Sequence, residues 1–169
     1  WKMAAQLKPQ SSKWPYADAV THFARAVGAA RSGDAVTAQE DVAHLAKLRD
    51  ALAAGKDAYW TEQVDIQRLA AQAWIELAQG NTIRALEEMR LVADHEDATD
   101  KHPVTPGPLA PARELLGEML LQTGRPAAAL FEFQRSQEKE PNRLRGFYGA
   151  GHAAELAGRD EIARANYES

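Results

Sequence analysis

The chain has 169 residues, of which 45% are hydrophobic and 26% are charged, a composition that is ordinary for a globular protein. Its 20 basic and 24 acidic side chains give a formal net charge of -4, which offers no positive field to a phosphate backbone and argues against nucleic-acid binding. The absence of cysteine excludes disulfides and cysteine-ligated zinc, and no apolar run approaches the roughly 18 residues that predict a membrane span.

The first residues, WKMAAQLKPQ, have no signal-peptide pattern. Because the chain begins at Trp1 and not at methionine, we expect the amino terminus of a longer parent protein to be missing. A chain without cysteine fits the cytoplasm and the periplasm equally well, so the sequence leaves the compartment open. We expect an irregular segment over 1 to 15, followed by one helical domain over 16 to 169.

The first predicted hairpin covers 16 to 53, with helices near 16 to 32 and 34 to 53. Gly33 lies where the first helix must stop and the chain must reverse, which is a common position for glycine. Asp34 follows it and is a suitable amino-terminal cap for the second helix. This hairpin is the least regular of those we predict.

The second predicted hairpin covers 57 to 96, with helices near 57 to 79 and 82 to 96, and Gly80 is its turn residue. Tyr59 and Trp60 stand near its start. We expect these two rings to fill the junction between the first two hairpins, and the alternative is an exposed aromatic patch where a partner docks.

A polar stretch over 95 to 108 follows, and it contains three prolines. Within it lie five side chains able to bind metal, namely His95, Glu96, Asp97, Asp100 and His102. Their spacing matches no zinc motif such as H-E-x-x-H, and polar clusters of this kind are usually solvated or cap helix ends. A metal-dependent enzyme that uses 95 to 102 is therefore the least favoured of the functions we consider.

The last 60 residues contain an internal repeat. The segments that begin at Ala110 and Leu144 align without gaps at a period of 34 residues. Apolar residues follow helical spacing in both segments, and no strand-like alternation is present. We place hairpins over 109 to 141 and 142 to 169, with helices near 109 to 123, 126 to 139, 142 to 157 and 159 to 168.

Four pairs of equivalent residues define the repeat. They are Gly117 with Gly151, Gly124 with Gly158, Ala129 with Ala163, and Phe133 with Tyr167. The first glycine of each segment lies inside a helix, where it costs up to about 1 kcal/mol relative to alanine, so we expect close packing against it. The second lies at the turn between the two helices.

These residues resemble the signature of the tetratricopeptide repeat (TPR), which runs W-x2-L-G-x2-Y, then A-x3-F, then P. The matching positions here are Leu116, Gly117, Leu120, Ala129, Phe133 and Pro141, with Arg113 in place of the usual aromatic residue. The chain from about Tyr16 onward resembles the carboxy-terminal part of uncharacterised bacterial TPR proteins. The resemblance implies an all-α, right-handed superhelix of about eight helices, with further repeats before Trp1, and it brings no activity.

In TPR arrays the first helix of each hairpin lines a concave groove that holds a ligand. Carried onto this sequence, the resemblance implies a groove lined by Trp74, Glu114, Glu118, Arg145, Tyr148, His152 and Glu155. Trp74, Glu118 and His152 occupy equivalent positions and are expected to form a row. The two glutamates favour a basic or neutral partner segment over a free carboxylate. The alternative is that Trp74 belongs to the core and the polar residues are solvated.

The sequence thus predicts a module that binds a protein or peptide within a larger bacterial protein, and not an enzyme. No catalytic residues, metal or cofactor are expected, because neither a G-x-S-x-G nor a Cys-His arrangement is present. The glycines at 146, 149 and 151 imitate a phosphate loop, yet they fall inside a predicted helix. The alternative function is a structural spacer or a homodimerisation surface without a ligand.

Overall fold

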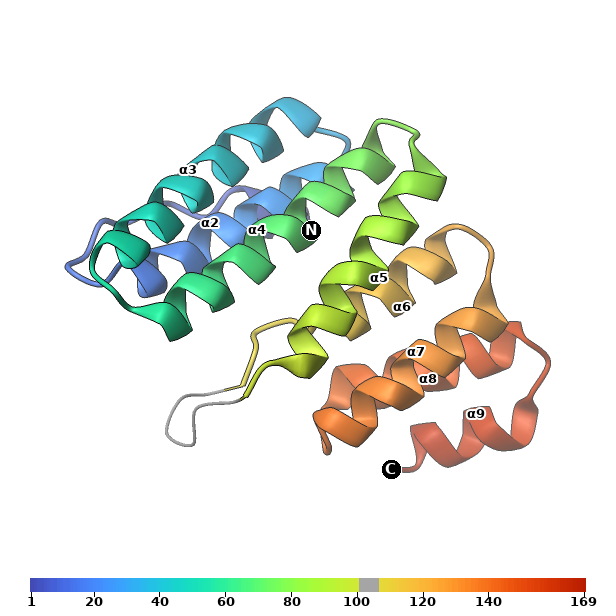
Figure 1. Cartoon of the computed structure of the whole chain (residues 1–169). Coiled ribbons are helices and arrows are strands. Elements are labelled where there is room, and N and C mark those ends of the chain that lie inside the picture. Colours follow the sequence, from blue (N-terminus) through green and yellow to red (C-terminus); the bar gives the residue numbers. More distant parts are fainter. Residues whose placement is uncertain (101–106) are drawn as a thin grey trace. The chain divides into compact units, whose positions relative to one another are not determined.

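The computed structural model describes residues 1 to 100 and 107 to 169, and over these ranges the protein is all-α (Figure 1). Its helices are α1 (Lys2–Ala5), α2 (Pro15–Arg31), α3 (Ala35–Ala54), α4 (Ala58–Ala78), α5 (Thr82–Ala98), α6 (Ala112–Gln122), α7 (Pro126–Lys139), α8 (Leu144–Leu156) and α9 (Asp160–Tyr167). Within the described part of the chain, none of these helices combines the length and apolarity that a bilayer crossing requires.

The chain divides into two compact units, Trp1–Met89 and Arg90–Ser169, and α5 contributes its first half to one and its second half to the other. In unit 1, α2 packs against both α3 and α4, α3 packs against α4, and α1 lies on α2. The core of this unit contains many alanines, together with larger buried side chains such as Phe23, Leu45 and Ile75.

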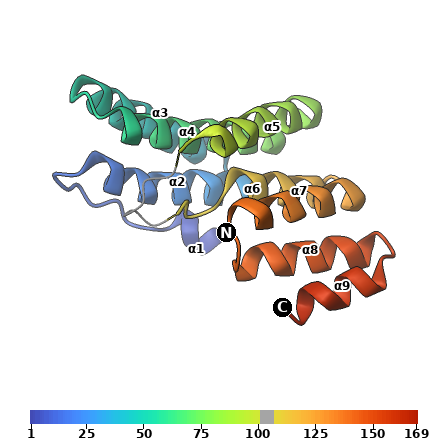
Figure 2. The same cartoon turned by 60° about the horizontal axis from the view of Figure 1, so that its bottom comes forward.

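In unit 2 each helix from α6 to α8 packs against the one that follows it, and α6 also contacts α8. Figure 2 shows α8 and α9 as the last antiparallel pair of this unit, below α6 and α7. Gln137 Nε2 on α7 donates a hydrogen bond of 3.1 Å to Asn166 Oδ1 on α9. The sequential packing matches the hairpin order that the repeat predicts.

The predicted turn glycines are confirmed. Gly33, Gly80, Gly124 and Gly158 all have φ between +68° and +87°, the left-handed region that glycine enters without steric cost. Asp34 caps α3 as expected, because its carboxylate accepts a hydrogen bond of 3.0 Å from the Thr37 amide. The sequence therefore predicts the chain reversal within each hairpin correctly, with a physical reason for each.

Gly80→Ala should lower the free energy of unfolding by about 1 to 2 kcal/mol, because a Cβ is strained at φ +87° even though no atom lies within 4 Å of it. Gly55→Ala is the matched control, since Gly55 caps α3 with φ -75° and tolerates a side chain. Urea denaturation of the two variants measures the difference. Equal effects of the two substitutions would contradict the role given to backbone strain.

The interior glycines of unit 2 make room for aromatic rings. A Cβ added to Gly117 would lie 2.8 Å from Phe133 Cε2, and one added to Gly149 would lie 2.4 Å from Phe133 Cε1. Phe133 on α7 is therefore held between α6 and α8. One repeat later, a Cβ on Gly151 would lie 2.5 Å from Tyr167 Cε1, which repeats the contact between Gly117 and Phe133. The expected close packing is present in both segments.

The aromatic residues near the start of α4 pack inside unit 1. Trp60 stacks on Tyr16 of α2 with ring centroids 4.3 Å apart and planes 9° apart, and Tyr59 meets Trp60 edge-on at 5.1 Å. This agrees with the expectation that these rings fill the junction between the first two hairpins. Trp14, which is half-exposed, extends the cluster at 6.0 Å from Tyr16.

The predicted and observed helices differ mainly at their ends. The segment 1 to 15 was expected to be irregular, yet it contains the single turn α1, whose chain lies so close to Gly28 that a Cβ there would be 2.6 Å from the Ala5 nitrogen. α6 begins at Ala112, three residues after the predicted start, and α5 extends two residues beyond its predicted end to Ala98.

Candidate functional site

Four of the predicted groove residues lie along one face of α8 in unit 2. Positions 145, 148, 152 and 155 follow one another at intervals of three or four residues, which is about one helical turn each. At one end, Arg145 Nε donates a hydrogen bond of 2.7 Å to Glu118 Oε1 on α6. The structure therefore brings together the predicted residues Glu118 and Arg145 as an ion pair between neighbouring helices.

Tyr148 is the most exposed aromatic residue of this face, with 62% of its surface accessible. Its ring centroid lies 6.2 Å from that of His152 and 6.1 Å from that of Tyr167 on α9. The Tyr167 hydroxyl in turn donates a hydrogen bond of 3.1 Å to Glu155 Oε2. We define the α8 surface as Arg145, Tyr148, His152, Glu155 and Tyr167, together with Glu118.

Tyr167 was not among the predicted groove residues. The repeat alignment pairs it with Phe133, so the sequence assigned it to packing. One side of its ring does pack on Gly151, as the alignment indicates, yet 48% of the residue is exposed beside Tyr148. The signal that could have revealed it is the hydroxyl group, which distinguishes Tyr167 from the buried Phe133.

Glu114, another predicted groove residue, has a structural role. It is 1% exposed, and its carboxylate accepts a hydrogen bond of 2.7 Å from Arg143 Nε. Arg143 also donates to the carbonyl oxygens of Pro108 and Leu109, so it joins the chain before α6 to the start of α8. A basic ligand would have to compete with Arg143 for Glu114 and with Arg145 for Glu118.

Trp74 belongs to α4 in unit 1, where it is 1% exposed. The Arg31 guanidinium lies over its ring at 4.2 Å from the centroid, and over the Trp1 ring at 4.0 Å. The indole Nε1 has no hydrogen-bond partner among the described residues. The predicted row of Trp74, Glu118 and His152 draws on residues of both units and stays a prediction.

The side chains over 95 to 102 that are able to bind metal are largely used by the fold. His95, Glu96 and Asp97 lie in the last turns of α5, and His102 is outside the described residues. The Glu96 carboxylate accepts a hydrogen bond of 2.6 Å from the Ala112 amide and so fixes the start of α6. The described residues contain no group of three side chains placed to hold a metal ion.

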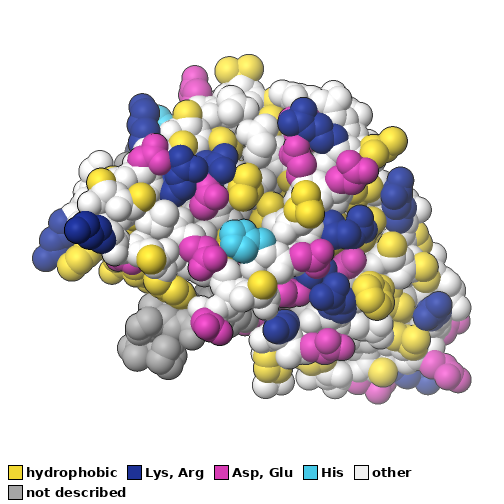
Figure 3. Space-filling view, viewed as in Figure 1, with side chains coloured by type: hydrophobic (Ala, Val, Ile, Leu, Met, Phe, Trp, Pro, Cys, Tyr) yellow, Lys and Arg dark blue, Asp and Glu magenta, His cyan; other side chains and the backbone are white. Residues whose placement is uncertain are grey.

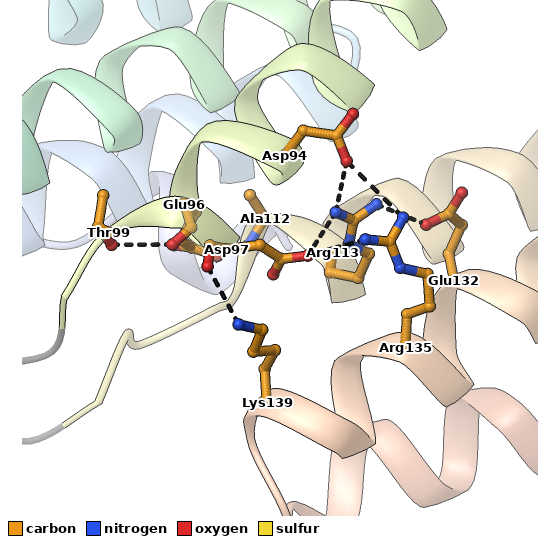
Figure 4. Close-up of polar contacts among 9 residues, drawn as sticks. All are labelled: Asp94, Glu96, Asp97, Thr99, Ala112, Arg113, Glu132, Arg135 and Lys139. Carbon is orange, nitrogen blue, oxygen red and sulfur yellow. Dashed lines mark hydrogen bonds and ion pairs between the residues drawn. The ribbon is translucent and has the colours of Figure 1, made fainter.

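Arg113 is the centre of the strongest polar cluster of unit 2 (Figure 4). It is 1% exposed and donates hydrogen bonds to Asp94 at 2.6 Å, to Glu132 at 2.8 Å and to Asp97. The carboxylates come from α5 and α7, so the guanidinium joins α6 to both. From α7, Arg135 pairs with the Asp97 carboxylate at 3.4 Å, and Lys139 donates a hydrogen bond of 3.2 Å to the Asp97 backbone carbonyl oxygen.

Burial alone would lower the pKa of Arg113, but its hydrogen bonds to Asp94, Glu132 and Asp97 outweigh burial and raise the pKa above the ordinary value. The guanidinium is therefore charged at every pH at which the protein is handled. A polar cavity of about 190 Å³ lies beside the cluster, and its lining includes Thr99, Pro111 and Ser136. This volume is below the roughly 300 Å³ typical of small-molecule sites.

No family model, no curated protein and no solved structure matches the chain. The chemistry of the site must therefore be argued from the residues themselves. Figure 3 shows basic and acidic side chains interspersed over the face in view, in keeping with the small net charge. Specific contacts, and not a long-range field, are what the α8 surface offers a ligand.

The hydrogen bond between Tyr167 and Glu155 gives a test of this surface by pH titration. Burial and then the Glu155 carboxylate raise the pKa of Tyr167 above its ordinary value. The fold thus favours the protonated phenol of Tyr167. The contribution of this phenol to stability is complete below the ordinary tyrosine pKa, and it is lost as the pH rises through the folded-state pKa.

We expect Glu155→Gln to lower the pKa of Tyr167, because the substitution removes the negative charge that opposes phenolate formation. Ultraviolet titration at the phenolate band, with Tyr167→Phe to identify the signal, measures the change. An unchanged titration curve for Glu155→Gln would show that the hydrogen bond is not formed in solution.

Proposed function

We propose that the chain is a protein-interaction module, a TPR-like helical array within a larger bacterial protein, and that it holds a partner segment on the α8 surface of unit 2. The observation that carries the proposal is the exposed ring of Tyr148, which lies beside His152 and Tyr167 and next to the ion pair of Arg145 with Glu118. Tyrosine and arginine are the residue types that most often supply binding energy at protein interfaces.

The chemistry of these residues favours a largely neutral partner. Glu118 is compensated by Arg145, and Glu155 accepts a hydrogen bond from Tyr167, so the acidic groups of the surface already have partners. What is offered to a ligand is the face of an aromatic ring, an imidazole and a phenol oxygen. An apolar segment that can also accept and donate hydrogen bonds fits this set.

The repeat supports a helical shape for the bound segment. Phe133 is covered on both sides, by Gly117 of α6 and Gly149 of α8, whereas the equivalent Tyr167 has Gly151 on one side and remains half-exposed. A helix that carries glycine or alanine at the contact would cover Tyr167 as α8 covers Phe133. Helices bound in grooves are a common mode of peptide recognition.

The proposal is tested by selecting peptides from a displayed library on the full chain and measuring their affinity for two variants. Tyr148→Ser removes the proposed anchor, and Phe131→Ser is the matched control because Phe131 is an aromatic residue of unit 2 with a similar exposure of 58%. Both positions are exposed, so both variants should fold.

We expect selected peptides to lose at least tenfold in affinity on Tyr148→Ser, since an interface anchor contributes about 2 kcal/mol or more, and to bind Phe131→Ser unchanged. A library that yields no binder, or binders that ignore Tyr148, would count against the proposal. Self-association of the chain that is lost in Tyr148→Ser would instead support the homodimerisation surface.

A further inference from the structure

Two histidines of unit 1 lie in contact on neighbouring helices, and neither the repeat nor the α8 surface uses them. His22 on α2 and His44 on α3 have ring centroids 4.8 Å apart and planes 3° apart. The His22 side chain is 14% exposed, whereas His44 is open to solvent. The pair is therefore accessible from one side of the antiparallel helices α2 and α3 in Figure 1.

Both rings are bound through the same nitrogen. His22 Nδ1 lies 2.7 Å from Asp41 Oδ1, and His44 Nδ1 lies 2.9 Å from the Glu40 carbonyl oxygen. A carboxylate and a carbonyl can only accept, so Nδ1 is the donor in each ring, and in the neutral imidazole Nε2 then carries the free lone pair. Histidines that bind metals are typically oriented by such a partner on the other ring nitrogen.

Asp41 is held in place as the support of His22. It is 3% exposed, and both of its oxygens also accept hydrogen bonds of 3.0 Å from Arg25 Nε. Arg25 is itself anchored, because its Nη1 donates to the Leu7 carbonyl oxygen at 2.6 Å. Both oxygens of the Asp41 carboxylate already accept hydrogen bonds, so the carboxylate orients the imidazole and does not itself serve as a metal ligand.

We propose that His22 and His44 together bind a divalent transition-metal ion, such as Zn²⁺ or Ni²⁺, through their Nε2 atoms. Imidazole suits these ions, whereas Mg²⁺ and Ca²⁺ prefer oxygen ligands. The described residues offer no third ligand, so water completes the coordination.

The spacing of the rings suits this role. Two imidazole nitrogens at about 2.0 to 2.1 Å from one zinc ion place their ring centres about 5 Å apart, and the observed separation is 4.8 Å. Because the ring planes are parallel, one ring must turn to bring both lone pairs onto the ion. The exposed His44 can do so by giving up its hydrogen bond to the Glu40 carbonyl oxygen, since the second side-chain torsion of histidine has a broad energy minimum. His22 keeps its orientation through Asp41.

The test is calorimetric titration of the untagged full chain with ZnCl₂, NiCl₂ and MgCl₂, combined with NMR spectra of the imidazole nitrogens. We expect one Zn²⁺ or Ni²⁺ per chain, no binding of Mg²⁺, and shifts of the Nε2 signals of His22 and His44. His44→Ala should weaken binding at least tenfold, and His152→Ala, on α8 of the other unit, is the matched control that should not change it.

Asp41→Asn provides a second variant that keeps both ligands but removes the orienting charge, and it should weaken binding by about 10-fold to 100-fold. Circular dichroism verifies that each variant is folded. Affinity that is unchanged in His44→Ala, or Nε2 shifts confined to other histidines, would overturn the proposal. Neither result bears on peptide binding, which uses different residues in unit 2.

Discussion

Replacing Arg113 by alanine should lower the free energy of unfolding by about 3 to 5 kcal/mol, because it leaves buried carboxylates without their counter-charge. Glu132 is 5% exposed, and the Asp97 carboxylate accepts hydrogen bonds from Arg113 and Arg135, so neither can regain its hydration without opening the interface between α5, α6 and α7. Chemical denaturation followed by circular dichroism measures the loss.

The pairwise part of this effect can be isolated by a double-mutant cycle with Glu132→Ala. We expect Arg113→Ala with Glu132→Ala to be less destabilising than the sum of the two single substitutions, because removing both partners removes the uncompensated charge. Arg113→Lys keeps the charge but cannot donate hydrogen bonds to three carboxylates in different directions. Its free energy of unfolding should therefore lie between those of wild type and Arg113→Ala. Additive single effects would show that the cluster does not act as a unit.

Gly149→Ala should destabilise the protein by about 1 to 3 kcal/mol, in spite of the higher helix propensity of alanine. The added Cβ would lie 2.4 Å from Phe133 Cε1, and the ring cannot retreat because Gly117 of α6 lies against its other side. The steric cost therefore exceeds the gain of up to about 1 kcal/mol from helix propensity.

Gly146→Ala is the matched control on the same helix. Its added Cβ would lie 3.5 Å from the nearest atom, Glu114 Oε1, which is an ordinary contact. We expect this variant to be as stable as wild type or more stable, and Phe133→Leu to relieve part of the cost of Gly149→Ala. Thermal unfolding of wild type, the three single variants and the double variant of Gly149→Ala with Phe133→Leu measures these effects. Equal effects at 146 and 149 would contradict the close packing of Phe133.

The helices and their turns could be predicted from the sequence because they depend on local signals. Helical periodicity places the hairpins, and a glycine at the turn within each hairpin supplies the left-handed conformation that Gly33, Gly80, Gly124 and Gly158 adopt. Between hairpins the same conformation is held by Lys56 and Asn142, which no local signal singled out. The 34-residue alignment also predicts close packing at Gly117 and Gly151, since equivalent residues of a repeat occupy equivalent environments.

The polar pairing could not be predicted, because it joins residues that are far apart in sequence. Arg113 was recognised as a departure from the expected aromatic residue, yet nothing local indicates that Asp94 and Glu132 would surround it. In the same way, the sequence predicts Glu114 and Glu118 as acidic residues of a groove, and only the fold shows that Arg143 and Arg145 pair with them. The contact of His22 with His44 likewise depends on how α2 packs on α3.

The most direct test of the interaction module is NMR of the isotope-labelled full chain titrated with a peptide selected for binding. If the α8 surface is the ligand site, the largest shift changes will fall on Arg145, Tyr148 and His152, with Tyr167 on α9 among them. Shift changes confined to unit 1, or spread evenly over the chain, would contradict the proposed function.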